Sequence, residues 1–128
     1  MTLTQEKFLH LRNISAYRKS FNLSNNLWEI VLKWDRIAQD TVGKQMIRSM
    51  DSISANIAEG FGRYHKKDKE KFYYNARGST YESLDWLQKA KLRNLVSTDI
   101  YNKIFATLSE LPKEINSLIR YTETHLEK

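Results

Sequence analysis

Apolar residues recur at every third or fourth position over most of this sequence, a spacing that favours α-helices over any other regular structure. One such row runs through Met46, Met50, Ile53 and Ile57. Glycine and proline, which punctuate folds with frequent tight turns, occur only four times and once in 128 residues. The sequence therefore predicts an all-α protein and leaves no strand pattern over.

Four segments carry the helical pattern, at about residues 15–37, 41–62, 67–93 and 98–125. Asp40 or Thr41 is suited to cap the start of the second. Pro112 lies inside the fourth, but the apolar row continues in phase across it, so we predict one helix kinked at Pro112 rather than two helices. Residues before about Leu11 are expected to fray.

Four helices with short connections pack most simply as an antiparallel up-down-up-down four-helix bundle, here a single domain over residues 1–128. The apolar faces are wide, however, and the rings of Trp28, Tyr81 and Trp86 cannot all point at one narrow axis. Apolar surface left outside a bundle indicates association with another protein or with further copies of the chain.

Composition narrows the possible chemistry. Lys and Arg total 21 against 15 Asp and Glu, and the net charge of +6 favours polyanionic partners. The chain has no cysteine, which excludes disulfides and thiolate catalysis and fits a reducing cytoplasm. Its three histidines are widely separated, so we expect no metal and no cofactor. We also expect no secretory signal and no membrane span.

The stretch SISANIAEGFGR, from Ser52 to Arg63, places polar groups on neighbouring turns of the second predicted helix. We call its polar residues and the one a turn upstream the polar stripe: Arg48, Ser52, Asn56, Glu59 and Arg63. Catalysis by Glu59 has little support, because no histidine, cysteine or second carboxylate lies beside it at helical spacing. The stripe is then either a solvated face or a subunit seam, in which Glu59 must be paired with Arg48, Arg63 or Arg77 of the same or the next chain.

A second block, ARGSTYE, lies on the third predicted helix and contains Ala76, Gly78, Ser79 and Glu82. The two blocks together resemble the signature of the bacterial 23S rRNA intervening-sequence proteins, Ser-Ile-x-x-Asn-Ile-Ala-Glu-Gly-x-x-Arg followed by Ala-x-Gly-Ser-x-x-Glu. This chain departs from the family in having "DRIAQDT" where a Phe-Pro pair is common, Ser54 where proline is common, and Pro112.

The resemblance implies a closed homopentamer of four-helix bundles whose biochemical role is largely unassigned. It also adds Arg77 and Glu82 to the residues expected at a subunit interface or in the polar stripe. A related fold, the accessory protein of diversity-generating retroelements, is a basic pentamer that binds a reverse transcriptase and nucleic acid. That link is an analogy between folds and does not by itself transfer function.

Three glycines lie within the two blocks. Gly60 and Gly62 are expected to let the chain leave the second helix through a left-handed conformation. Gly78 is expected to allow a close crossing of two helices.

The connection between the second and third helices carries the basic run "RYHKKDKEK". Its five cations are Arg63, Lys66, Lys67, Lys69 and Lys71. A run of this kind is either a solubilising loop or, repeated around a ring of subunits, a surface for phosphate backbones. Three nearby tyrosines, Tyr64, Tyr73 and Tyr74, are candidates for stacking on single-stranded bases.

We therefore predict a non-enzymatic homo-oligomer, a pentamer by resemblance, whose basic surface binds RNA, DNA or a nucleic-acid-handling protein. The alternative is a protein–protein adaptor that uses exposed aromatic side chains such as Tyr81 and Trp86 and has no nucleic-acid role.

Overall fold

The computed structural model describes residues 2–126, with the side chains of residues 7–9 left aside. This part of the chain contains helices and no strand, which confirms the all-α prediction. The elements are α1 (Leu3–Arg12), α2 (Ser15–Val31), α3 (Arg36–Ala38), the π-helical turn η1 (Gln39–Gly43), α4 (Lys44–Gly62), α5 (Lys66–Leu92) and α6 (Thr98–His125).

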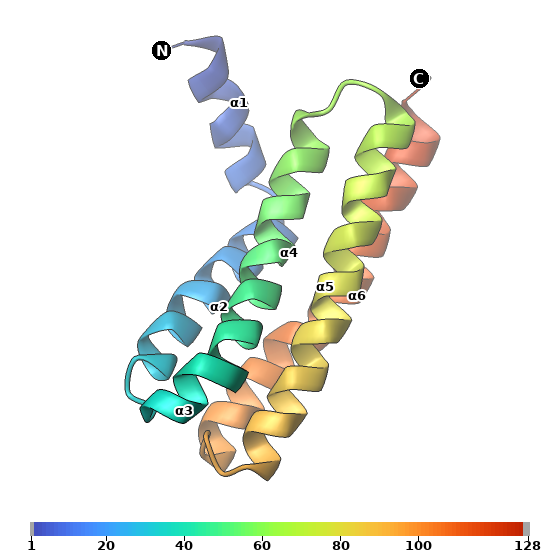
Figure 1. Ribbon diagram of the computed structural model, residues 1–128. Coiled ribbons are helices and arrows are strands. Elements are labelled where there is room, and N and C mark those ends of the chain that lie inside the picture. Colours follow the sequence, from blue (N-terminus) through green and yellow to red (C-terminus); the bar gives the residue numbers. More distant parts are fainter. Residues whose placement is uncertain (1, 127–128) are drawn as a thin grey trace.

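The long helices α2, α4, α5 and α6 lie along one another, whereas α1 projects from one end of the molecule (Figure 1). Helix α2 packs against α4 and α6, and α5 packs against the same two helices. The four helices therefore surround a common core. None of the helices in residues 2–126 is both long enough and apolar enough to cross a membrane.

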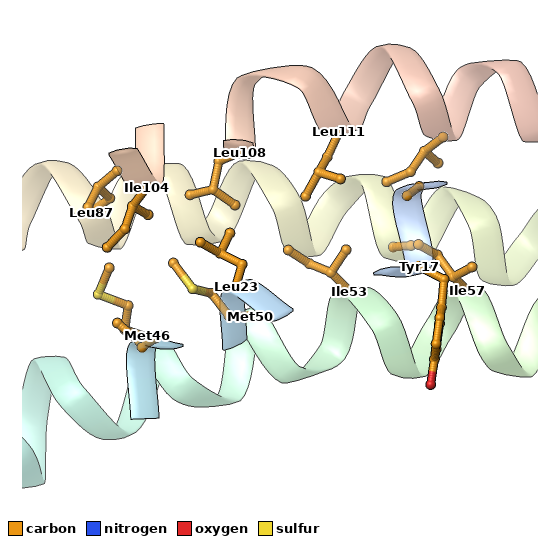
Figure 2. Packing of buried hydrophobic residues seen from close by; sticks show 14 of the residues in the cluster. Tyr17, Leu23, Met46, Met50, Ile53, Ile57, Leu87, Ile104, Leu108 and Leu111 are labelled. Atoms are coloured by element: carbon orange, nitrogen blue, oxygen red, sulfur yellow. The ribbon is translucent and has the colours of Figure 1, made fainter. Parts of the chain in front are cut away.

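The core contains the apolar rows predicted for α4 and α6. Met46, Met50, Ile53 and Ile57 of α4 are fully buried, and Leu108, Leu111 and Ile115 of α6 meet them from across the core. Figure 2 places Met46, Leu87 and Ile104 toward one end of this core and Ile57 and Tyr17 toward the other. Because these rows were predicted from spacing alone, the core shows that the helical phase was assigned correctly.

The first connection differs from its prediction. Helix α2 ends at Val31, not at about residue 37, and Asp35 then caps the next helical segment by accepting a hydrogen bond from the Ala38 N–H at 2.9 Å. The predicted caps Asp40 and Thr41 were wrong, since both lie inside η1. The apolar spacing predicted too long a helix because it included Trp34. This side chain packs against the core although it lies beyond the end of α2.

The N-terminal segment contains a helix, α1, where the sequence predicted none. Thr2 and Gln5 form a capping box, in which the Thr2 hydroxyl accepts from the Gln5 N–H at 3.1 Å and the Gln5 side chain accepts from the Thr2 N–H at 2.7 Å. Two of the free N–H groups at the start of α1 are thereby satisfied.

Helix α5 ends at Leu92, and Asn94, two residues later, has a φ of 59°. The Leu95 N–H donates to the Ala90 carbonyl at 2.9 Å and the Asn94 N–H to the Lys91 carbonyl at 3.1 Å, the pattern of a Schellman motif. Helix α6 then begins at a Ser97 cap and runs through Pro112 as one helix, as the unbroken apolar phase predicted.

Candidate functional site

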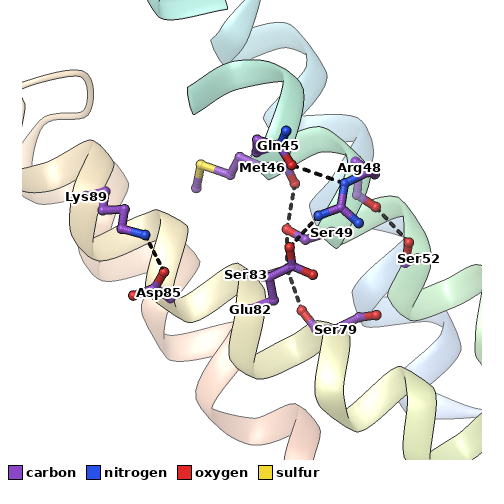
Figure 3. A network of polar contacts seen from close by, with 10 residues as sticks. All are labelled: Gln45, Met46, Arg48, Ser49, Ser52, Ser79, Glu82, Ser83, Asp85 and Lys89. Atoms are coloured by element: carbon purple, nitrogen blue, oxygen red, sulfur yellow. Dashed lines mark hydrogen bonds and ion pairs between the residues drawn. The ribbon is translucent and has the colours of Figure 1, made fainter. Parts of the chain in front are cut away.

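The polar stripe begins with an ion pair between α4 and α5. The Arg48 guanidinium donates to the Glu82 carboxylate, and its Nε donates to Gln45 Oε1 at 3.2 Å (Figure 3). The Arg48 and Glu82 side chains are 55% and 39% exposed in the single chain. A pair this open contributes under about 1 kcal/mol to folding.

Two buried serines lie nearby on the same pair of helices. Ser83 Oγ donates to Ser49 Oγ at 3.0 Å and lies 2.8 Å from the Ser79 carbonyl, and Ser49 Oγ donates to the Met46 carbonyl at 3.1 Å (Figure 3). Both serines are fully buried. Because these hydroxyls bond to one another and to their own helices, they add a directional contact to an otherwise apolar seam.

Ser52 and Asn56, in the middle of the stripe, are turned back onto α4. Ser52 Oγ donates to the Arg48 carbonyl and Asn56 Nδ2 donates to the Ser52 carbonyl, each at 2.8 Å. In the single chain both side chains therefore use a donor within their own helix.

Glu59 pairs with Arg63 at 3.2 Å, and the two side chains are 51% and 45% exposed. Of the three arginines considered as partners of Glu59, Arg63 is the one that contacts it within the chain. The Arg63 guanidinium also lies over the Phe72 ring, 4.8 Å from its centroid. Glu59 is thus paired but not desolvated in one chain, and a subunit seam at this place stays a prediction.

Arg77 is separated from the polar stripe. It lies on the α5–α6 side of the molecule, where its Nη1 donates to Asn116 Oδ1 at 2.8 Å and its guanidinium covers the Tyr74 ring at 4.7 Å. The structure therefore brings Arg48 and Glu82 together, and Glu59 and Arg63 together, but places Arg77 on another seam.

Two lysines of the basic run are bound to helix ends. Lys69 Nζ donates to the Phe61 carbonyl at 2.8 Å and to the Gly60 carbonyl at 3.3 Å, at the end of α4. Lys66 Nζ donates to the Glu123 carbonyl at 2.8 Å, at the end of α6. Positive charge is favourable at these carbonyl-rich termini, so the two lysines fix the α4–α5 connection in place.

The other three cations of the run, Arg63, Lys67 and Lys71, are exposed. Lys71 Nζ lies 5.7 Å from the centroid of Phe72, the same ring that Arg63 covers. Two of the three exposed cations, Arg63 and Lys71, therefore lie close to the Phe72 ring near the start of α5.

The three candidate tyrosines lie in different surroundings. Tyr64 is 75% exposed and meets the His65 ring edge-on, with centroids 5.1 Å apart. Tyr73 is 4% exposed, and burial raises the pKa of its phenol to about 12, so it is a core residue and the prediction that it stacks on bases was wrong. Tyr74 is 43% exposed beneath Arg77.

A family model described as the 23S rRNA-intervening sequence protein matches residues 12–117. The chain belongs to that family. Among solved structures, this 23S rRNA-intervening sequence family member is similar to a protein of unknown function from the S23 ribosomal protein family of Bacteroides thetaiotaomicron. The two share a TM-score of 0.73 and 21% identity, over 82% of this chain and 95% of the other. That likeness supports the fold and supplies no activity. No curated protein matches the chain.

The glycines in the blocks that suggested the 23S rRNA-intervening sequence family do not act as predicted. No glycine in the described chain has a positive φ, so the left-handed exit at Gly60 and Gly62 was wrong. At Gly78 an added Cβ would meet nothing within 4 Å, so the close helix crossing was wrong there too. At Gly60, by contrast, a Cβ would lie 2.7 Å from Tyr73 Cε1, which makes Gly60 the site where α4 and α5 approach closely.

Sequence reasoning missed two polar partners in this family member. Asn116, the partner of Arg77, lies in α6 with no motif around it. The bond between Ser49 and Ser83 had a signal, because both serines interrupt apolar rows at helical spacing and a hydroxyl in a core needs a partner.

Proposed function

We propose that this protein is a non-enzymatic, homo-oligomeric scaffold of the cytoplasm that binds nucleic acid at the end of the molecule formed by the α4–α5 connection. In this proposal the four long helices form an antiparallel up-down-up-down bundle, and α6 is kinked at Pro112. The pairwise packing of α2 and α5 against both α4 and α6 supports the bundle.

One observation carries the nucleic-acid function. Lys66 and Lys69 hold the α4–α5 connection against the ends of α6 and α4, and the same connection presents Arg63, Lys67 and Lys71 to solvent. Lys66 and Lys69 add to the positive charge at this end of the molecule, and the three exposed cations are the ones that we expect to contact phosphates. A positive surface held by a fixed backbone attracts a phosphate chain without having to order itself first.

Oligomerisation is supported by apolar surface on α2 and on Leu32, the residue that follows it. Phe21, Trp28 and Leu32 recur at the spacing of one helical face and are 47%, 52% and 55% exposed. Large exposed side chains that line up in this way mark association surfaces. A pentamer, as the family resemblance implies, would set five basic connections on one rim, and a seam through the polar stripe would desolvate the Arg48–Glu82 pair and the Glu59 carboxylate.

Light scattering and nucleic-acid binding test the two halves of the proposal separately. We expect light scattering at micromolar concentration to give the mass of an oligomer. If the subunit seam passes through the polar stripe, the Glu59→Gln variant should have a lower mass than the wild type. We expect binding of labelled RNA or DNA that weakens with salt at a logarithmic slope near −2 for each engaged subunit, because three cations would each release about 0.7 counterion from a single strand.

The mass of a monomer would contradict the proposed scaffold. An affinity for nucleic acid that does not change with salt would contradict the proposed nucleic-acid surface. Capture of a protein partner without nucleic acid would favour the adaptor function. Of the two aromatic side chains named for that function, Tyr81 is the better candidate for contacting a partner, because it is 58% exposed. Trp86 packs against the core, and Lys89 Nζ lies 4.4 Å from the centroid of its ring.

A further inference from the structure

The α4–α5 connection holds an exposed aromatic ring among its cations. Tyr64 lies between Arg63, the last-turn partner of Glu59, and His65, the residue before α5. With three quarters of its surface open, it is one of the most exposed large hydrophobic side chains of the described chain. Burial in the core therefore does not explain an aromatic residue at this position.

The ring has one aromatic neighbour, and the backbone around it is anchored. The His65 imidazole meets Tyr64 at an interplanar angle of 88°, and the backbone on either side is fixed by the bonds of Lys66 and Lys69 to the ends of α6 and α4. An edge-on neighbour supports a ring while leaving a face open. A base that stacks on Tyr64 would therefore meet a surface that is already positioned.

Cations lie on both sides of the ring along the chain. Arg63 and Lys71 share the Phe72 ring at 4.8 and 5.7 Å, and Lys67 is exposed on the first turn of α5. Aromatic rings beside a basic track are the means by which proteins bind single strands without reading their sequence, because every base has a π-face. A duplex keeps its bases stacked inside and offers such a ring no partner.

We propose that Tyr64 is the base-stacking residue of a binding site for single-stranded nucleic acid, in which Arg63, Lys67 and Lys71 contact the phosphates. The inference rests on the proposed nucleic-acid function and specifies its ligand as an unpaired strand. Tyr73 is excluded from this role by its burial, and Tyr74 by its place beneath Arg77 on the α5–α6 side.

Fluorescence anisotropy on the full chain tests the proposal with four probes of equal length. They are labelled oligo-dT and oligo-U of about 10 nucleotides, within the usual site size, an abasic deoxyribose-phosphate strand, and a DNA duplex. We expect oligo-dT and oligo-U to bind more tightly than the abasic strand and the duplex. Comparison of oligo-dT with oligo-U separates a DNA preference from an RNA preference.

The variant Tyr64→Ala is expected to weaken oligo-dT and oligo-U binding by roughly 5- to 150-fold, the range that one lost base stack produces. Binding of the abasic strand and the salt slope should stay as in the wild type, because the phosphate contacts remain. Tyr64→Phe should retain binding, since the phenyl ring keeps the π-face. Tyr81→Ala is the matched control, an exposed tyrosine that lies 15 residues, or about 22 Å, along α5 from its start at Lys66.

Three results would overturn the inference, and they bear differently on the function. Equal binding of strands by the wild type and Tyr64→Ala, or a preference for duplex, removes the stacking role but leaves a nucleic-acid surface. Failure to bind any of the four probes at low salt removes the proposed function as well. Because the Tyr64 ring is exposed, we expect Tyr64→Ala to keep the unfolding midpoint of the wild type. An unchanged midpoint shows that any loss of binding does not result from unfolding of the variant.

Discussion

The close approach at Gly60 gives the sharpest test of the packing between α4 and α5. In Gly60→Ala the added methyl group would lie 2.7 and 2.9 Å from Tyr73 Cε1 and Cδ1 and 3.0 Å from the Lys69 carbonyl oxygen. Neither neighbour can yield easily, because the Tyr73 ring is 4% exposed and the carbonyl belongs to the α5 backbone. Overpacking of this kind costs about 1–3 kcal/mol, and alanine returns about 0.5–1 kcal/mol through its helix preference. We expect a net loss of about 1–2 kcal/mol in the free energy of unfolding.

Gly78→Ala is the matched control, since it makes the same change inside α5 where the new Cβ meets nothing within 4 Å. It should gain about 0.5–1 kcal/mol, so the two variants are expected to move in opposite directions. Urea unfolding followed by circular dichroism, at one protein concentration, measures both midpoints and shows whether the slope is unchanged. If Gly60→Ala unfolds at the same urea concentration as Gly78→Ala or later, the contact with Tyr73 does not constrain the seam.

Three further predictions concern single contacts. Lys69→Met removes the hydrogen bonds to the Gly60 and Phe61 carbonyls and should lower the free energy of unfolding by about 1 kcal/mol, measured by thermal unfolding. Lys67→Met, as the control, should leave the stability unchanged and make the salt slope of nucleic-acid binding shallower. Pro112→Ala restores a helical N–H inside α6 and should raise the melting temperature, with a gain of up to about 3 kcal/mol; a lower melting temperature would show that the proline is required there. Burial raises the pKa of Tyr73 from 10.0 to about 12, so the unfolded chain loses this proton first as the pH rises. Stability should therefore be intact below about pH 10 and fall between pH 10 and 12, and Tyr73→Phe should reduce that fall in urea titrations at stepped pH.

The helical phase was predictable because burial repeats with the geometry of the helix. Ile53 and Ile57 recur on the face that the structure buries, and the row across Pro112 kept its phase in α6. The start of α1 was predictable too, since Thr2 and Gln5 have the spacing of a capping box.

The parts that could not be predicted depend on contacts between distant segments. Nothing near Lys66 in the sequence shows that its amine will reach the Glu123 carbonyl, so a phosphate-binding lysine and a helix-capping lysine look alike there. The glycines have the same difficulty. Gly60 and Gly78 both lie inside helices, and only the position of Tyr73 distinguishes the one that is packed from the one that is open.

Helix α1 and the end of α6 lie at the same end of the molecule as the α4–α5 connection, whereas the turn between α5 and α6 lies at the other (Figure 1). An affinity tag or fluorescent fusion at either terminus would thus be attached toward the same end of the molecule as the proposed nucleic-acid surface. Labels for imaging or immobilisation are better inserted near Asn94, where a surface anchored through that turn would leave the opposite end facing the solution.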